Sequence, residues 1–161
     1  MFQDDFVFTA DMDLYTDAAG SVGFAAIWRT HWCCGTWPPF WVVSKATKNI
    51  GLLELFPIIV AFELWGRFFA NKRILIHSDN KGVLFAINCL SSKSENVIKL
   101  LRYFVLLCLK FNIWVKARHV PGKQNTLADA LSRLQMTRFR LLFPEADLMG
   151  CKCPSHLWEL I

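Results

Sequence analysis

The sequence predicts an α/β fold: a five-stranded mixed sheet, three antiparallel strands followed by two parallel ones, with helices on both faces. Two observations support this prediction. The chain from Met12 to Trp37 alternates apolar and polar residues with the period of β-strands. The later chain alternates helix-period stretches with short β-branched runs, a pattern typical of strands connected by helices. Antiparallel strands followed by helix-linked ones imply a mixed sheet covered on both sides.

The antiparallel part is expected to be a three-stranded meander. Its strands are predicted at residues 12–21, 22–30 and 31–37. The first ends in a turn of small residues, and a tight turn around Thr30 joins the other two. Pro38–Phe40 ends the meander, and the polar stretch Ser44–Asn49 is predicted to be a loop.

Helices and strands then alternate. The expected order is a helix from about residue 52 to 71, a strand at 73–79, a helix at 80–88, a helix from 95 to about 111, a strand at 113–119 and a short helix at 126–134. Asp79 or Asn80 can cap the second helix. Ser92 and Glu95 have the S-x-x-E spacing of a capping box ahead of the third.

The composition indicates one compact domain. Of 161 residues, 54% are hydrophobic, and seven tryptophans and fourteen phenylalanines exclude a disordered chain. We expect the domain at residues 10–135, followed by a tail or linker at 136–161 with no clear period and no assigned role. The net charge of +5 suits a polyanionic partner without requiring one, because a solvated basic surface has the same composition.

The cysteines and the chain start favour an intracellular protein, cytoplasmic or nuclear, that is not secreted. Six cysteines at irregular spacings indicate reduced thiols. Asp4 and Asp5 occupy the positions where a signal peptide would be basic. Charged residues interrupt both long apolar stretches, so no membrane partner is expected. Cys151 and Cys153 with the nearby His156 lack a fourth zinc ligand.

Four acids stand out from the thirteen in the chain. Asp17 and Asp79 end predicted strands, Glu54 lies early in the first long helix, and Asp129 lies in the final helix. Side chains at the strand ends of an α/β sheet project into the crevice where such folds bind ligands. Carboxylates in contact repel one another unless a cation joins them, and hard oxygen ligands favour Mg²⁺ or Mn²⁺. Four carboxylates carry about as much negative charge as two divalent ions carry positive charge. This balance indicates a two-metal phosphodiester site.

Each acid also has an ordinary structural interpretation. Asp17 could form a turn, Glu54 could interact with the helix dipole, and Asp79 could be an N-cap. Four acids on converging ends favour one shared site over separate roles. Glu63 is a control, because nine residues after Glu54 a helix turns it to the opposite side.

The ordered motifs resemble a known family. The matching stretches are "YTDAAGSVGFAAIW", "LLELFPIIVAFE", "IHSDNKGVL" and "HVPGKQNTLADALSR". Together they resemble the ribonuclease H domain of retroelement reverse transcriptases, and are most similar to the DIRS-type, tyrosine-recombinase elements. The resemblance covers roughly Asp13 to Arg133, with a weaker match through the tail. It implies a ribonuclease H-like fold.

The resemblance also implies an activity and its residues. The four metal carboxylates of the family fall on Asp17, Glu54, Asp79 and Asp129, and would hold two Mg²⁺ ions, with Mn²⁺ as a substitute. His119, ten residues before Asp129, matches the family's mobile histidine, which would help to protonate the leaving oxygen or shuttle product. The implied reaction is hydrolysis of the RNA strand of RNA–DNA hybrids, leaving a 3′-hydroxyl and a 5′-phosphate.

Contacts to the hybrid are expected at 2′-hydroxyls and phosphates. The candidate residues are Ala18, Ser21, Asn80 and Asn125 for the sugar edge, and Lys93, Lys116, Arg118 and Lys123 for phosphates. Only "CLSSKS" separates the second and third helices, so the basic protruding helix of some cellular enzymes is missing. We therefore expect an upstream reverse transcriptase polymerase domain to contribute to binding of the hybrid.

Two other functions remain open. The chain could be a catalytically silent retroelement-derived domain that acts as a nucleic-acid-binding or structural module. It could also be a transposase or integrase on a related fold, although those usually place a glutamate as the last essential acid. Here that position holds Asp129, after a His-Val-Pro-Gly stretch at residues 119–122.

Overall fold

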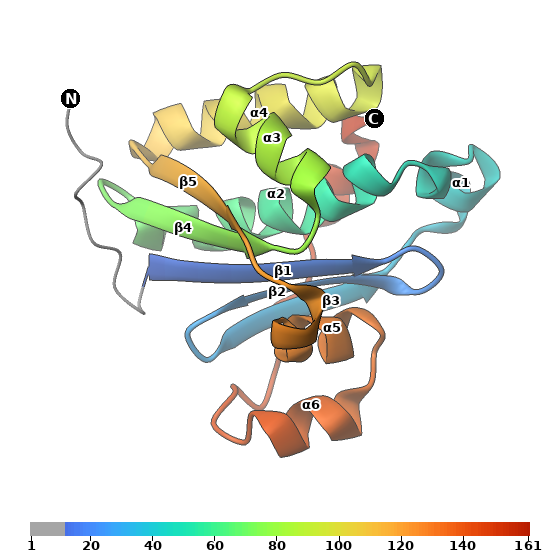
Figure 1. Ribbon diagram of the computed structural model, residues 1–161, viewed down its shortest axis with the longest axis vertical. Coiled ribbons are helices and arrows are strands. Elements are labelled where there is room, and N and C mark those ends of the chain that lie inside the picture. Colours follow the sequence, from blue (N-terminus) through green and yellow to red (C-terminus); the bar gives the residue numbers. More distant parts are fainter. Residues whose placement is uncertain (1–11) are drawn as a thin grey trace.

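The computed structural model describes residues 12–161; Asp4, Asp5 and the first two residues of the predicted domain 10–135 lie outside this range. Five strands form one mixed sheet in the order β3-β2-β1-β4-β5 (Figure 1). The strands are β1 (Asp13–Ala19), β2 (Gly23–Trp28), β3 (His31–Thr36), β4 (Arg73–Ser78) and β5 (Trp114–His119). The first three are antiparallel, and β4 and β5 run parallel to β1. The predicted fold class is confirmed.

Strands β1 and β4 separate before β1 ends. Their parallel pairing covers only Asp13–Tyr15 against Leu75–His77, whereas β1 pairs with β2 from Leu14 to its end at Ala19. The carbonyl of Thr16, just past the last β1–β4 pair, instead accepts a hydrogen bond from the side chain of Asn125. This separation leaves room for side chains between the carboxyl ends of the two strands, the usual ligand position in such sheets.

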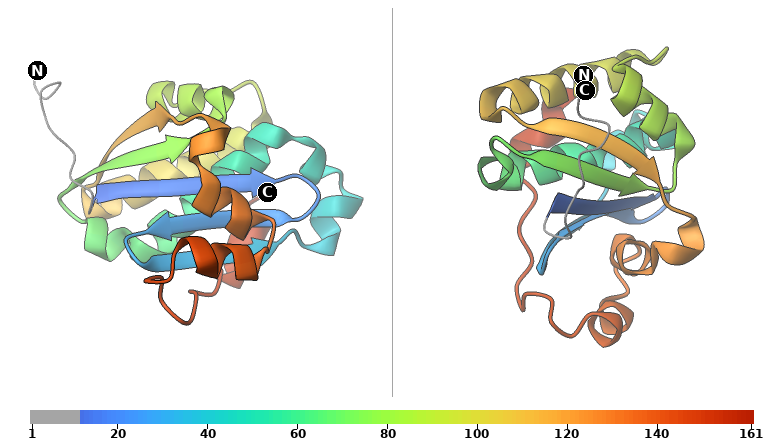
Figure 2. Two further views of the ribbon diagram at one scale, coloured as in Figure 1. Left: turned by 60° about the horizontal axis from the view of Figure 1, so that its bottom comes forward. Right: turned by 60° about the vertical axis from the view of Figure 1, so that its left-hand side comes forward.

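Helices cover both faces of the sheet. Helices α2 (Ile50–Phe69), α3 (Lys81–Cys89) and α4 (Glu95–Phe111) lie on one face, and α5 (Thr126–Ser132) and α6 (Met136–Leu142) lie on the other (Figure 2). All six residues of β2 are buried, because alternate side chains point to opposite faces. Phe24 and Ala26 pack in the α2 cluster, while Ala25 and Ile27 pack with α5.

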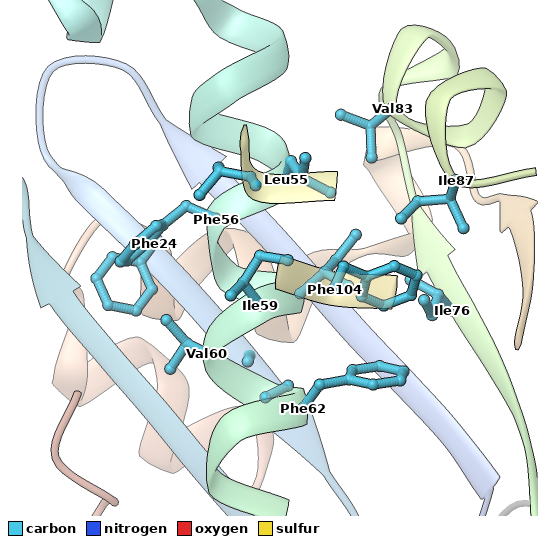
Figure 3. Packing of buried hydrophobic residues seen from close by; sticks show 14 of the residues in the cluster. Phe24, Leu55, Phe56, Ile59, Val60, Phe62, Ile76, Val83, Ile87 and Phe104 are labelled. Atoms are coloured by element: carbon cyan, nitrogen blue, oxygen red, sulfur yellow. The ribbon is translucent and has the colours of Figure 1, made fainter. Parts of the chain in front are cut away.

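Helix α2 lies at the centre of the larger core. Asn49 caps it by accepting a hydrogen bond from the backbone N–H of Leu52. Figure 3 shows Leu55, Phe56, Ile59 and Phe62 of this helix packed between the sheet and Phe104 of α4. Each fully buried side chain of this size stabilises the fold by about 1.5–3 kcal/mol relative to exposure. This packing fixes the position of the first turns of α2, which carry Glu54.

The N-cap of α3 is Asn80, so the Asp79 side chain is not used for capping. Asn80, not Asp79, accepts the first-turn backbone hydrogen bond, at 2.8 Å. The predicted capping box at Ser92 and Glu95 is wrong, because Ser94 is the N-cap of α4. Several serines in this loop could serve as caps. Ser94, the one that caps α4, also accepts a hydrogen bond from the Asn49 side chain at its Oγ.

Two segments contain helices that the sequence pattern did not predict. The region after the meander forms α1 (Pro39–Val43) and a 3-10 turn at Ala46–Lys48. The segment expected to be an irregular tail contains α6 and a 3-10 helix at Ser155–Leu160. These elements have three to seven residues, which is too short to show a helical period.

Residues 143–161 pass along the β3 edge to the other face of the sheet (Figure 2). Cys151 pairs with Cys33 of β3 by a parallel bridge. Beyond it, Leu157 is fully buried and Trp158 stacks on Phe56 of α2, with ring centroids 4.4 Å apart. The segment therefore contributes to the larger core. Within residues 12–161, none of the helices has the length and apolarity that crossing a bilayer requires.

Candidate metal centre

Three of the four predicted acids meet in space. Asp17 comes from β1, Glu54 from the second turn of α2 and Asp79 from the position after β4. One carboxylate oxygen from each lies within 4.8 Å of the other two. The meeting point is the gap where β1 and β4 separate, so sheet topology and the core packing of α2 together produce the cluster.

Burial and mutual repulsion raise the pKa of all three acids. Burial, then the charge of Asp79, raises the pKa of Asp17 to about 6. Burial, then the charges of Asp17 and Asp79, raises the pKa of Glu54 to about 9. The pKa of Asp79 is also raised, chiefly by burial. Without a cation the cluster therefore holds protons near neutral pH.

The donor set fits a divalent metal ion. Glu54 is 6% exposed, and its buried Oε2 has no hydrogen-bond partner within residues 12–161. Native proteins rarely leave a buried polar atom unpaired, because its desolvation is not compensated. A cation between the carboxylates would supply the missing partner. Three hard oxygen ligands suit Mg²⁺ or Mn²⁺ better than zinc.

Neighbouring groups hold the acids in place. Ser132 of α5, itself fully buried, donates its hydroxyl to Asp17 Oδ2 at 3.0 Å. The backbone N–H of Ala18 partly offsets the rise in the pKa of both Asp17 and Glu54. The loop between β5 and α5 approaches Asp79 so closely that a Cβ at Gly122 would lie 3.3 Å from Asp79 Oδ2.

Asp129 stands beside the cluster and is paired with two arginines. Arg133 Nε donates to Asp129 Oδ1 at 3.0 Å, and Arg138 Nη1 donates to Asp129 Oδ2 at 3.1 Å. Partial burial acts to raise the pKa of Asp129, but these two hydrogen bonds outweigh it and hold the pKa below its usual value. Asp129 still raises the pKa of Asp17 and Asp79, so its charge acts on the cluster.

His119 lies at the rim of the site. It ends β5 in register with Ser78, the residue before Asp79, and its side chain is exposed. Its charge lowers the pKa of Asp79. Glu63 lies elsewhere, where the hydroxyl of Tyr103 donates to it. The prediction that Glu63 does not share the site is confirmed.

The predicted nucleic-acid contacts fall into two groups. Exposed residues are Ser21 in the β1–β2 turn, Lys93 before α4, Lys116 and Arg118 on β5, and Lys123 in the β5–α5 loop. The other three have structural partners. Asn80 caps α3, and Ala18 lies within β1. Asn125 is 3% exposed and donates to Thr16 O at 3.0 Å, so it holds the loop to β1 and does not present its side chain to a ligand.

Three supporting residues were missed by the sequence analysis. Ser132 and Arg133 follow Asp129 at helical spacings of three and four residues, so a search along the helix could have found them. Arg138 lies nine residues away on another helix, and no local pattern links it to Asp129.

The sheet order and helix arrangement recur in solved structures. The ribonuclease H1 from the halophilic archaeon Halobacterium salinarum NRC-1 superposes with a TM-score of 0.53 at 17% identity, covering 77% of this chain and 97% of that one. The LC11 ribonuclease H1 in complex with an RNA/DNA hybrid gives a TM-score of 0.59 at 14% identity, covering 74% and 91%.

This chain has the ribonuclease H fold. The N-terminal ribonuclease H domain of rv2228c from Mycobacterium tuberculosis gives a TM-score of 0.50 at 16% identity, covering 74% of this chain and 95% of that one. No protein family and no curated protein sequence matches the chain. In this ribonuclease H fold, the three acids lie at the carboxyl ends of β1 and β4 and on the first turns of α2.

Proposed function

We propose that this protein is a metal-dependent endonuclease that hydrolyses the RNA strand of RNA–DNA hybrids. The observation that supports it most directly is the buried carboxylate cluster of Asp17, Glu54 and Asp79, with an unpartnered Glu54 oxygen, in a ribonuclease H fold. A purely structural role would not favour three acids in contact, because their repulsion and desolvation destabilise the metal-free protein.

The three acids would hold the metal, and Asp129 would be the fourth ligand. Two Mg²⁺ ions held there, or Mn²⁺ in their place, would supply a lower pKa for the attacking water and charge stabilisation for the departing 3′ oxygen. Ser132 orients Asp17 through its hydroxyl. His119, exposed at the rim next to Asp79, would help to protonate the departing oxygen or move product away.

The substrate is proposed on two grounds. The similar LC11 enzyme is in complex with an RNA/DNA hybrid. In this chain, the exposed Lys93, Lys116, Arg118 and Lys123 can contact phosphates. Ser21 and Asn80 would face the sugar edge, together with the main chain at Ala18.

The biological context is also a proposal. The motif resemblance supports an origin in a retroelement reverse transcriptase, most like the DIRS type, acting inside the cell. The loop between α3 and α4 spans only residues 90–94 and carries one lysine. Such a short loop supports the expectation that an upstream polymerase domain contributes to hybrid binding.

The test is cleavage of a hybrid labelled on its RNA strand, with Mg²⁺ or Mn²⁺. We expect cuts that leave 3′-hydroxyl ends, and a loss of about 100- to 1,000-fold in rate for Asp79→Asn, because electrostatic stabilisation of a developing charge supplies effects of this size. Glu63→Gln is the matched control, because Glu63 is an acid outside the site, and it should cleave at the wild-type rate.

A catalytically silent module is the second candidate. One observation favours it: both oxygens of Asp129 are occupied by arginines. If neither the domain nor a fusion with its upstream region cuts hybrid, while hybrid binding is retained, the silent module is the correct function.

A further inference from the structure

Two arginines form ion pairs with Asp129, the acid beside the buried carboxylate cluster. Arg133, the residue that follows α5, donates to Asp129 Oδ1, and Arg138 in α6 donates to Asp129 Oδ2. We call this pair the arginine clamp. Each carboxylate oxygen thus has a charged hydrogen-bond partner, and the clamp with Asp129 carries a net charge of +1.

Helix α6 sets the position of the distal half of the clamp. Arg138 also donates to Gln135 Oε1 at 2.9 Å. The next residue, Phe139, is fully buried and packs edge-on against Trp32 of β3, with centroids 5.5 Å apart. The backbone of α6 is therefore anchored, and only the exposed end of Arg138 is able to turn away from Asp129.

We propose that Arg138 is a positioning residue that keeps Asp129 from completing the metal site until nucleic acid is bound. This inference rests on the proposed function. An ion that binds Asp129 either replaces an arginine hydrogen bond or shares a carboxylate oxygen with one, and in both cases it places two positive charges beside two guanidinium groups. Asp17, Glu54 and Asp79 have no basic partner of this kind in the described contacts. Arg138 thus acts chiefly on the ion that Asp129 would bind, whereas Arg133 also interacts with the charge of Asp17.

A phosphodiester is the ligand that would open the clamp. Arginine binds phosphate oxygens through paired hydrogen bonds, at least as well as it binds a carboxylate. The side chains of Arg133 and Arg138 are 50% and 44% exposed, so both can reach a ligand from solvent. A backbone phosphate that draws Arg138 away releases Asp129. Substrate binding then completes the site, and the metal-loaded protein does not hold a fully assembled centre between substrates.

The first test measures Mn²⁺ binding to the metal-free protein, by titration calorimetry or by the electron paramagnetic resonance signal of free Mn²⁺. We expect one stronger and one weaker ion in the wild type. Arg138→Gln should strengthen the weaker ion about two- to fivefold, the range expected for removing one exposed ion pair, and leave the stronger ion unchanged. Arg67→Gln is the matched control: it loses the same charge on α2, roughly 20 Å further along the helix than Glu54.

The second test measures the Mg²⁺ concentration that gives half the maximal cleavage rate. At low hybrid concentration Arg138→Gln should need about two- to fivefold less Mg²⁺ than the wild type, and at saturating hybrid the two should converge, because phosphate has already opened the clamp.

The outcomes separate two kinds of failure. If Arg138→Gln leaves the weaker ion unchanged or weakens it, relative to Arg67→Gln, the clamp does not oppose metal binding and the inference is wrong, while the proposed function stands. If the wild type binds no Mn²⁺, and Asp17→Asn leaves the rate of hybrid cleavage unchanged, both the inference and the proposed function fail.

Discussion

Glu54 shows how a single residue depends on its surroundings. The same acid in a solvent-exposed first turn would only interact with the helix dipole. In this protein it lies in the core beside Asp17, so its pKa rises to about 9 and one of its oxygens has no described partner. The chemistry of the site therefore comes from placing ordinary acids where water cannot stabilise their charge.

This electrostatic cost predicts a pH-dependent stability. Asp17 and Glu54 bind protons more tightly in the folded than in the unfolded protein, since their folded pKa values, about 6 and about 9, exceed the ordinary values of 3.8 and 4.5. In EDTA the free energy of unfolding should therefore fall as pH rises from about 5 to 8. Differential scanning calorimetry across this range measures the effect.

Glu54→Gln tests the same cost directly. Removing the charge should stabilise the metal-free protein at pH 8 by about 1.4 kcal/mol or more and flatten its pH dependence, while Mg²⁺ no longer raises the melting temperature. A variant that is less stable than the wild type in EDTA at pH 8 would show that Glu54 carries no such electrostatic penalty.

At the scale of elements, the loop between β5 and α5 holds the site together. It begins at His119, passes Gly122 against Asp79 and ends at Asn125, whose side chain binds the Thr16 carbonyl where β1 leaves β4. A buried carbonyl at a strand separation requires a donor, and Asn125 provides it. Together with the hydrogen bond from Ser132 to Asp17, this contact ties α5 to the central strand.

Asn125→Ala should therefore act on stability and not on nucleic-acid contacts. Loss of the donor leaves a buried carbonyl unpaired, and we expect the free energy of unfolding to fall by about 1–3 kcal/mol in urea denaturation. Hybrid binding by the folded fraction, measured by fluorescence anisotropy, should match the wild type. Weaker hybrid binding at unchanged stability would instead support the direct contact between Asn125 and the sugar that the sequence predicts.

At the scale of the whole molecule, the C-terminal segment joins the two faces of the sheet. Helix α6 packs on the α5 face through Phe139, and residues 143–161 run along β3 to place Leu157 and Trp158 on the other face. Trp158 contacts Phe24, Trp37, Trp41 and Phe56, which come from β2, the loop after β3, α1 and α2. The segment predicted as a tail thus forms part of the fold.

Trp158→Ala measures this contribution. Removing a tryptophan that stacks in the core should lower the free energy of unfolding by about 3 kcal/mol, measured in guanidinium chloride. Met149→Ala is the control in the same segment, because Met149 is 84% exposed and should change stability by less than about 0.5 kcal/mol. Equal, small effects of both variants would indicate that the segment is not required for folding.

The sequence alone determined the order of the five strands and of the long helices between them, the mixed sheet, and the convergence of Asp17, Glu54 and Asp79. These follow from local periods and from the rule that strand ends meet at one edge of a sheet. The contacts of Arg138 with Asp129, of Asn125 with Thr16 and of Trp158 with the core were decided only by the tertiary structure. Each joins residues on different elements, so no period or spacing along the chain records it.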